Sequence, residues 1–272
     1  MKDIFYTEIR NKIREITDFL EDAEMLMAAA DKILELLHIA RKEGLLALED
    51  ALDSLGEDDF WHYFREMITF IVDGSDKEVM EDIFFSRYFT LDLKGAEGLV
   101  YLIFLRGTFA IQAGENEYVV TKRLQSLLPV EVLQIYEPKL WNVERTHEEK
   151  VKELCQREPA VDRDNDNYFF YHMADYTFAS LTDADMKRIL KDVSDCDVST
   201  ALKGMDGKAA KKALDNLSLG RQKMVVEDME YMGPVRSMDV VASEQKILNI
   251  LVNLINDGEI DGNNYSHLSA FM

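Results

Sequence analysis

The sequence predicts an all-α protein, a helical bundle, and three observations support this. Apolar residues recur at steps of three and four, which places them on one helix face; they are Leu26, Ala30, Ile33, Leu37 and Ala40 in the clearest case. No Asn-Gly or Asp-Gly pair joins two alternating apolar runs, so no β-hairpin is indicated. Ser, Thr and Gly stand where helices are expected to start and stop.

In the first half of the chain two further segments read as helices. Phe60, Phe64, Met67, Ile68 and Ile71 share one face, and Gly74 is expected to end that helix. The run 99–105 is apolar throughout but stops at Arg106. Because a membrane-spanning helix needs about 20 apolar residues, this run predicts a buried core helix.

In the second half, residues that start or end helices are more frequent. The signals are Thr182 with Asp185 as a capping box, Gly204 as a stop, Ser218 as an N-cap, Gly233-Pro234 as a stop, and Ser237 and Gly258 around a long last helix. They predict a compact bundle with short turns.

A polar stretch separates these halves. Between Cys155 and Asn167 the chain runs through Glu158-Pro159 and then an Asp- and Asn-rich segment with little that could be buried. We therefore expect two parts, residues 1–160 and 161–272.

Composition narrows the class of partner. The 272 residues carry a net charge of −21, which disfavours binding to nucleic acid or anionic lipid. Residues 1–89 hold 22 acids and 10 bases, whereas residues 181–260 hold 14 and 11. Cys155 and Cys196 read as reduced thiols, and no secretion signal or membrane span is apparent. A cytoplasmic protein is expected.

No catalytic, cofactor or metal motif is found. Asp162, Asp164 and Asp166 begin like a calcium loop, but Asn167 and Met173 occupy the positions of its glycine and its last ligand. His62 and Glu66 share a helix face without a second histidine. We expect a protein that is not an enzyme and needs no cofactor or metal.

A set of short motifs in the second half has a family resemblance. They are Ala-Leu-Lys-Gly (201–204), Asn-Leu-Ser (216–218), Glu-Asp (227–228), Gly-Pro-Val-Arg (233–236) and Glu-Gln-Lys-Ile-Leu (244–248). In order, spacing and charge type they resemble the C-terminal domain of the flagellar motor switch protein FliG, over about residues 166–260. The resemblance implies armadillo-like helices and the rotor surface on which torque is generated.

The same resemblance implies which residues meet the stator. Lys203, Glu227, Asp228 and Arg236 match the charged ridge of the family. The ridge arginine usually found two residues after the serine is Gly220 here, and Arg221 follows about 100° further round the helix. Whether Arg221 replaces it is left open by the sequence.

A second resemblance lies nearer the N-terminus. Residues 40–49 read Ala-Arg-Lys-Glu-Gly-Leu-Leu-Ala-Leu-Glu, and residues 71–76 read Ile-Val-Asp-Gly-Ser-Asp. This segment, about 29–88, resembles the cytoplasmic loop of the stator protein MotA, although the chain lacks the four membrane spans of that family. The resemblance implies that Arg41 and Glu49 face opposite charges on a rotor.

Each charged residue also has a plain structural reading. On the helix after Ser218, Lys223, Glu227 and Glu230 are expected on an exposed stripe, with Val225, Met229 and Met232 inward. Such a stripe can be no more than a solvated face, and a cation such as Lys203 is favoured in any last turn. A basic cluster, Lys208, Lys211 and Lys212, is either solvated or meets acidic residues 1–89 of this or another copy.

The favoured function is a rotor or switch component of the flagellar motor, at the inner face of the membrane by the basal body. Its partners would be rotor-ring and stator proteins, met through charged contacts. Two alternatives stay open: a clutch-like adaptor that mimics both stator and rotor surfaces, and a helical scaffold outside the motor. Residues 90–165 read only as a helical bundle.

Overall fold

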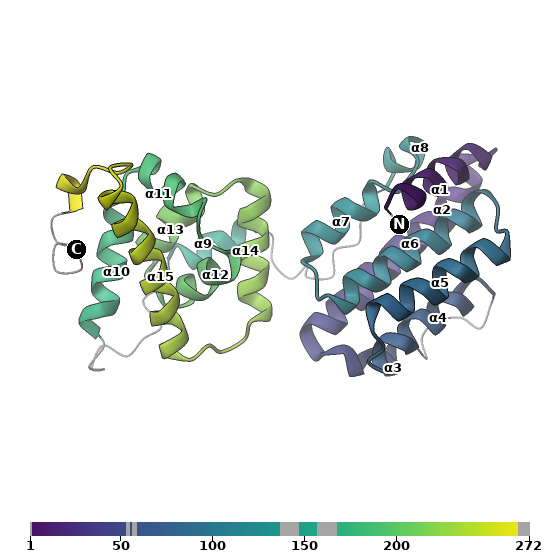
Figure 1. Cartoon of the computed structure of the whole chain (residues 1–272), viewed down its shortest axis with the longest axis horizontal. Helices are drawn as coiled ribbons and strands as arrows, with labels where there is room; N and C mark the ends of the chain where they lie inside the picture. Colours follow the sequence, from purple (N-terminus) through teal and green to yellow (C-terminus); the bar gives the residue numbers. More distant parts are fainter. Residues whose placement is uncertain (1, 53–54, 56–58, 137–146, 157–167, 266–272) are drawn as a thin grey trace. The chain divides into compact units, whose positions relative to one another are not determined.

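The chain divides into two compact units, residues 1–143 and 144–272, each with its own apolar core. The computed structural model describes residues 2–52, 55, 59–136, 147–156 and 168–265. Within these ranges every regular element is a helix and no strand occurs, which confirms the all-α prediction (Figure 1). None of the described helices is long and apolar enough to cross a membrane.

The first unit is built around α6. Its elements are α1 (Lys2–Glu15), α2 (Phe19–Glu43), the 3-10 helix η1 (Leu45–Ala47), α3 (Leu48–Leu52), α4 (Asp59–Val72), α5 (Lys77–Leu91), α6 (Gly95–Gln112), α7 (Glu117–Gln125) and α8 (Val130–Leu133). Helices α1, α2 and α4 pack on α6. Residues 99–105 are all buried, so the expected core helix is confirmed.

Left-handed glycines end helices in this unit. Gly74 has φ +73°, as expected for the stop after α4, and Gly44 has φ +92° between α2 and η1. Only glycine adopts such angles without steric cost, and here they reverse the chain direction. The apolar face expected on α2 is confirmed, because all five of its residues are buried in the first core.

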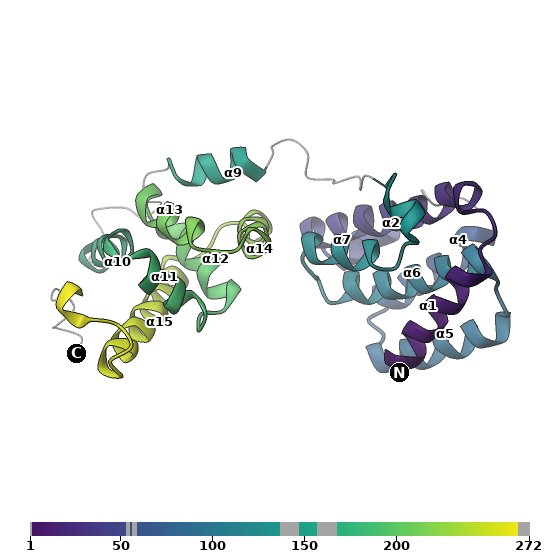
Figure 2. The same cartoon turned by 90° about the horizontal axis from the view of Figure 1, so that it is seen from above.

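The second unit consists of α9 (His147–Leu154), α10 (Tyr168–Ser180), α11 (Asp183–Leu190), α12 (Asp195–Gly204), α13 (Gly207–Asp215), α14 (Leu219–Tyr231) and α15 (Ser237–Asn256). Helix α12 packs against both α14 and α15, and α10 packs against α13 and α15. Helix α9 lies along the outside of α13 and α14 (Figure 2).

Capping side chains set the starts of these helices. The hydroxyl oxygen of Thr182 accepts a hydrogen bond from the amide of Asp185, and that of Ser218 accepts one from the amide of Arg221. Both N-caps were expected from the sequence. Each satisfies an amide that the first helical turn leaves without a partner.

The polar stretch expected to divide the chain, residues 157–167 with the division at 160/161, lies outside the described residues. The two compact units divide earlier, between Val143 and Glu144. The reason is α9, which packs against α13 and α14 and so joins the second unit rather than the first. A short amphipathic helix carries no sequence signal for which of two cores it will cover.

Candidate protein-interaction surface

Three helices that pack together bring four of the predicted site residues onto one unit. Lys203 is in the last turn of α12, Glu227 and Asp228 are on α14, and Arg236 is the N-cap residue of α15. Helix α12 packs against both of the others. We call these four residues the ridge. It holds two acids and two bases.

The turn between α14 and α15 is tied to α12. The ammonium of Lys203 donates a hydrogen bond of 3.0 Å to the carbonyl oxygen of Gly233. Gly233 has φ +62°, a conformation that glycine tolerates, and it begins the turn that leads to Arg236. Lys203 is therefore both a ridge charge and a fastener of the turn that presents Arg236. A last-turn cation is also favoured by the helix dipole.

Exposure differs along the ridge. Arg236 is exposed, whereas Lys203, Glu227 and Asp228 are half-buried. Each of these half-buried charges makes contacts within the chain. The ridge therefore offers a rigid set of charges with one freely accessible cation at its end.

The buried face of α14 follows the predicted pattern in part. Val225 and Met229 are buried as expected, and Val226 is buried with them. Met232 is only half-buried, with its sulfur 3.7 Å from the hydroxyl of Thr200.

The stripe expected to be exposed on α14 is not. Lys223, Glu227 and Glu230 are all half-buried. The Glu230 carboxylate accepts a hydrogen bond of 2.7 Å from the ammonium of Lys150 on α9, so α9 covers one flank of this helix. From the sequence, the residues of α9 were expected in the first part of the chain, so the packing of α9 over this flank of α14 was not predicted.

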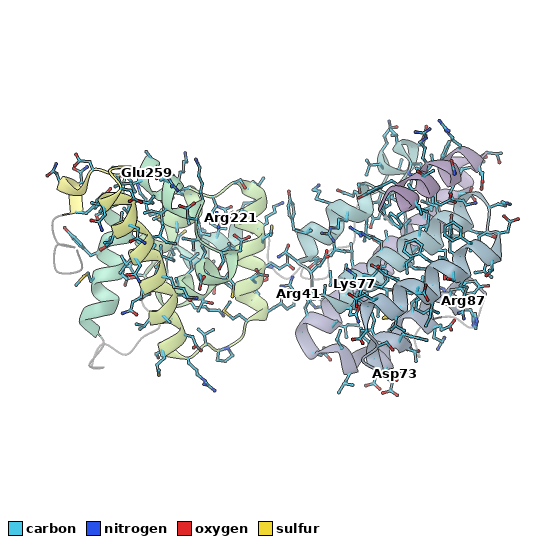
Figure 3. All side chains as sticks on the ribbon, viewed as in Figure 1. Arg41, Asp73, Lys77, Arg87, Arg221 and Glu259 are labelled. Carbon is cyan, nitrogen blue, oxygen red and sulfur yellow. The ribbon has the colours of Figure 1, made fainter. Side chains whose placement is uncertain are left out.

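Arg221 has its guanidinium turned into the unit. It donates to the carbonyl oxygens of Leu190 and Val193, the latter at 2.7 Å, and pairs with the carboxylate of Asp195. These three acceptors lie between the end of α11 and the start of α12, so Arg221 holds the first turn of α14 to that junction. Arg221 is labelled in Figure 3. Its position at the beginning of α14 separates it from Glu227 and Asp228 further along the same helix.

The two residues expected to act as a stator-like pair lie in the first unit. Arg41 is in the last turn of α2, and one of its guanidinium nitrogens lies 3.4 Å from the carbonyl oxygen of Glu115. Glu49 is exposed in the first turn of α3. Gly44 and η1 lie between α2 and α3, so the two residues stand on different helices.

Two residues of the ridge helices, Gly204 and Glu244, have roles that were not predicted from the sequence. A Cβ atom at Gly204 would lie 2.3 Å from Cγ1 of Val240, so glycine here allows α12 to approach α15 closely. Gly204 is the last residue of α12, but its φ is not positive. It therefore does not end the helix through a left-handed backbone conformation, and its role is the close packing on α15.

The second is Glu244 on α15, which is 0% exposed, and neither carboxyl oxygen has a hydrogen-bond partner. Burial, and then the negative charge of Asp175, raise the pKa of Glu244 to about 9. Its spacing from Val240, Ile247 and Leu251 would have revealed it, since all four fall on the buried face of α15.

The six helices α10–α15 form an all-α domain that carries the charged ridge. The family model of the FliG C-terminal domain matches residues 174–261, which run from within α10 to beyond α15. This stretch therefore matches the FliG C-terminal domain, the family that its motifs predicted. The family match does not reach residues 29–88, whose resemblance to a stator loop stays a prediction.

Curated relatives agree with this assignment. The chain is similar to the flagellar motor switch protein FliG of Thermotoga maritima, at 33% identity over 121 residues, 44% of this chain and 35% of the relative. It is also similar to FliG of Borreliella burgdorferi, at 36% over 80 residues, 29% of this chain and 23% of the relative. The chain thus spans only about a third or a quarter of these relatives. No solved structure is a significant match.

Proposed function

We propose that this chain is a component of the flagellar motor switch and that its ridge forms the rotor side of a rotor–stator contact. The observation that carries the proposal is the FliG C-terminal domain at residues 174–261, within which all four ridge residues fall. Lys203, Glu227 and Asp228 stand on α12 and α14, which pack together, and Arg236 follows the turn that Lys203 holds to α12.

Charged residues suit a contact that must form and break quickly. Exposed ion pairs contribute only about 0.2–1 kcal/mol each, but they steer association and fix its register. The mixture of two acids and two bases selects a partner with the reverse order of charges. A rigid backbone under these charges transmits force instead of yielding to it.

The place and partners follow from the same assignment. We expect the chain at the inner face of the cytoplasmic membrane by the basal body, in contact with rotor-ring and stator proteins. It would act by protein–protein contact and not by catalysis. Reorientation of the second unit would reverse the sense of rotation.

Affinity capture from the native cells tests the proposal. The tagged wild-type chain, Arg236→Asp and a control variant, Lys191→Asp, are compared, with captured proteins identified by mass spectrometry. Lys191 is exposed just after α11, a helix that carries no ridge residue, and its substitution makes the same change in charge. We expect rotor-ring and stator proteins with the wild type and the control, and loss of stator protein with Arg236→Asp. Recovery of neither with the wild type would remove the motor assignment.

One observation favours a clutch-like adaptor as second candidate. The chain is built as two compact units, and the stator-like pair Arg41 and Glu49 stands on the unit that does not carry the ridge. An adaptor predicts salt-sensitive binding between separately produced residues 1–143 and 144–272. In the basic cluster, however, Lys211 and Lys212 already pair with Asp215 and Asp183 at 2.6 Å each. Absence of binding would dismiss this candidate.

The third reading, a scaffold outside the motor, has a separate readout. Charge reversal at Asp228 or Arg236 that leaves swimming speed and switching unchanged would support it, provided that the variant proteins accumulate normally.

A further inference from the structure

Helix α9 is held on the second unit by polar contacts to α14. The ammonium of Lys150 lies 2.7 Å from the Glu230 carboxylate, and these side chains are 14% and 25% exposed. One turn earlier, the Nε2 atom of His147 lies 2.8 Å from the side-chain oxygen of Gln222. Two residues of α9, about one turn apart, thus contact two residues of α14 that are about two turns apart.

The apolar side of α9 rests on the core without entering it. Val151, Leu154 and Cys155 pack against the second core but are only half-buried. No residue of α9 is buried, whereas each of α10–α15 contributes buried residues. The core of this unit is therefore closed by the other six helices. A segment that buries little apolar surface has a low free energy of local opening.

A glycine under the end of α9 makes close docking possible. A Cβ atom at Gly207 would lie 2.2 Å from the carbonyl oxygen of Cys155 and 2.6 Å from its carbonyl carbon. Gly207 is the first residue of α13 and has no positive φ, so its backbone conformation does not require glycine. The close approach of α9 is what requires glycine at this position. The sequence of α13 is therefore adapted to the presence of α9.

Docked α9 stands beside the ridge. A hollow of about 180 Å³ is lined by Lys150, Glu153 and Leu154 from α9 and by Lys203, Val226, Met229 and Glu230 from α12 and α14. On α9 a base is followed three residues later by an acid. Across the hollow stand an acid, Glu230, and a base, Lys203, the latter a ridge residue. The charges on the two sides are complementary.

We propose that the surface formed by α13 and α14 beside the ridge is a docking surface for a short amphipathic helix, and that α9 is its built-in, displaceable occupant. A partner helix with a base and, three residues on, an acid would compete with α9 for the same contacts. Its identity as part of the stator rests on the proposed function; the docking and release of α9 do not.

The two cysteines make this testable in the full chain. Cys155 directly follows α9 and is half-buried, and burial raises the pKa of its thiol, whereas Cys196 is exposed on α12. We expect a thiol reagent to label Cys196 quickly and Cys155 slowly. Lys150→Glu sets two carboxylates against each other at Glu230 and should speed labelling of Cys155 about tenfold or more, with Cys196 unchanged.

Matched variants separate release of α9 from other effects. Lys152→Glu changes the charge of α9 equally at an exposed position and should leave labelling unchanged. Combining Lys150→Glu with Glu230→Lys should restore slow labelling. Gly207→Ala should release α9 without any change in charge, through the clash with Cys155.

A peptide with the sequence of residues 147–156, followed by fluorescence anisotropy, tests the vacated surface. It should bind the Lys150→Glu chain, whose vacated surface keeps both Glu230 and Gly207, and bind the wild-type chain, where α9 occupies that surface, far more weakly. Unchanged Cys155 labelling in both release variants would overturn the proposal. So would equal acceleration of both thiols, because α9 would then be an integral part of the fold.

Discussion

The ammonium of Lys203 at the end of α12 donates a hydrogen bond of 3.0 Å to the carbonyl oxygen of Gly233, which follows α14 and starts the turn to Arg236. A charge at the surface thereby fixes the backbone that presents another charge. The two ridge cations are mechanically coupled, and a substitution at Lys203 is expected to act at Arg236 as well as at its own position.

Lys203→Met removes the ammonium and keeps most of the apolar stem. We expect the second unit to lose about 1.5–3 kcal/mol, the range for a hydrogen bond with a charged donor, and amide hydrogen exchange around residues 233–237 to accelerate. Hydrogen-exchange mass spectrometry measures both the loss of stability of the unit and the faster exchange in the turn. Lys203→Arg, which keeps a donor, is the control. Fast exchange in the arginine variant too would mean that the turn depends on the exact length of the lysine.

Gly204→Ala tests the close packing of α12 on α15. The new methyl would meet Val240 at 2.3 Å, and overpacking of this kind costs about 1–3 kcal/mol. Val240→Ala makes room, so the double variant should be more stable than the sum of the single losses predicts. Both tryptophans of the sequence, Trp61 and Trp141, fall in residues 1–143, so their fluorescence should not change. Additive losses would show that the helices can shift apart freely.

Arg221→Lys separates a structural role from a ridge role. Lysine can keep the pairing with Asp195 but cannot reach all three acceptors at once, because it is a point charge on a flexible stem. We expect a loss of about 1–3 kcal/mol in denaturant unfolding of the second unit. Stator capture in cells should stay normal where the protein is folded. Lost capture with unchanged stability would instead place Arg221 on the ridge.

The helices could be predicted because local signals specify them. Thr182 and Ser218 cap where their side chains indicated, and the apolar run 99–105 is a core helix because no polar face interrupts it. The partner of α9 could not be predicted. Its half-buried Val151 and Leu154 would suit many surfaces, and the choice is made by Lys150 and Glu230, which lie eighty residues apart.

The candidate site, too, could be predicted only in part from the sequence. The motifs located Lys203, Glu227, Asp228 and Arg236, but charge type alone does not tell how far a side chain is exposed. Packing decides that, and it half-buries the first three of these residues.

Glu244 makes the stability of the second unit depend on pH. Its pKa is raised from 4.5 to about 9 by burial and by Asp175, so between these values the folded state binds a proton that the unfolded state has released. The contribution of this group is therefore most favourable below pH 4.5 and is lost as pH rises towards 9. The slope for one proton is at most about 1.4 kcal/mol per pH unit.

Glu244→Gln removes this ionisation and keeps the shape of the side chain. We expect the variant to gain stability relative to the wild type as pH rises from 5 to 8, with the difference growing by about 1 kcal/mol or more. Urea unfolding of the second unit, followed by circular dichroism with tryptophan fluorescence to identify the first, measures it at each pH. The free-energy cost of burying the amide of the variant is the same at pH 5 and at pH 8. Only the pH-dependent part of the stability difference therefore reports the protonation of Glu244. A difference that is equal at pH 5 and pH 8 would mean that Glu244 is ionised in the folded protein and has found a cation or water not apparent from its neighbours.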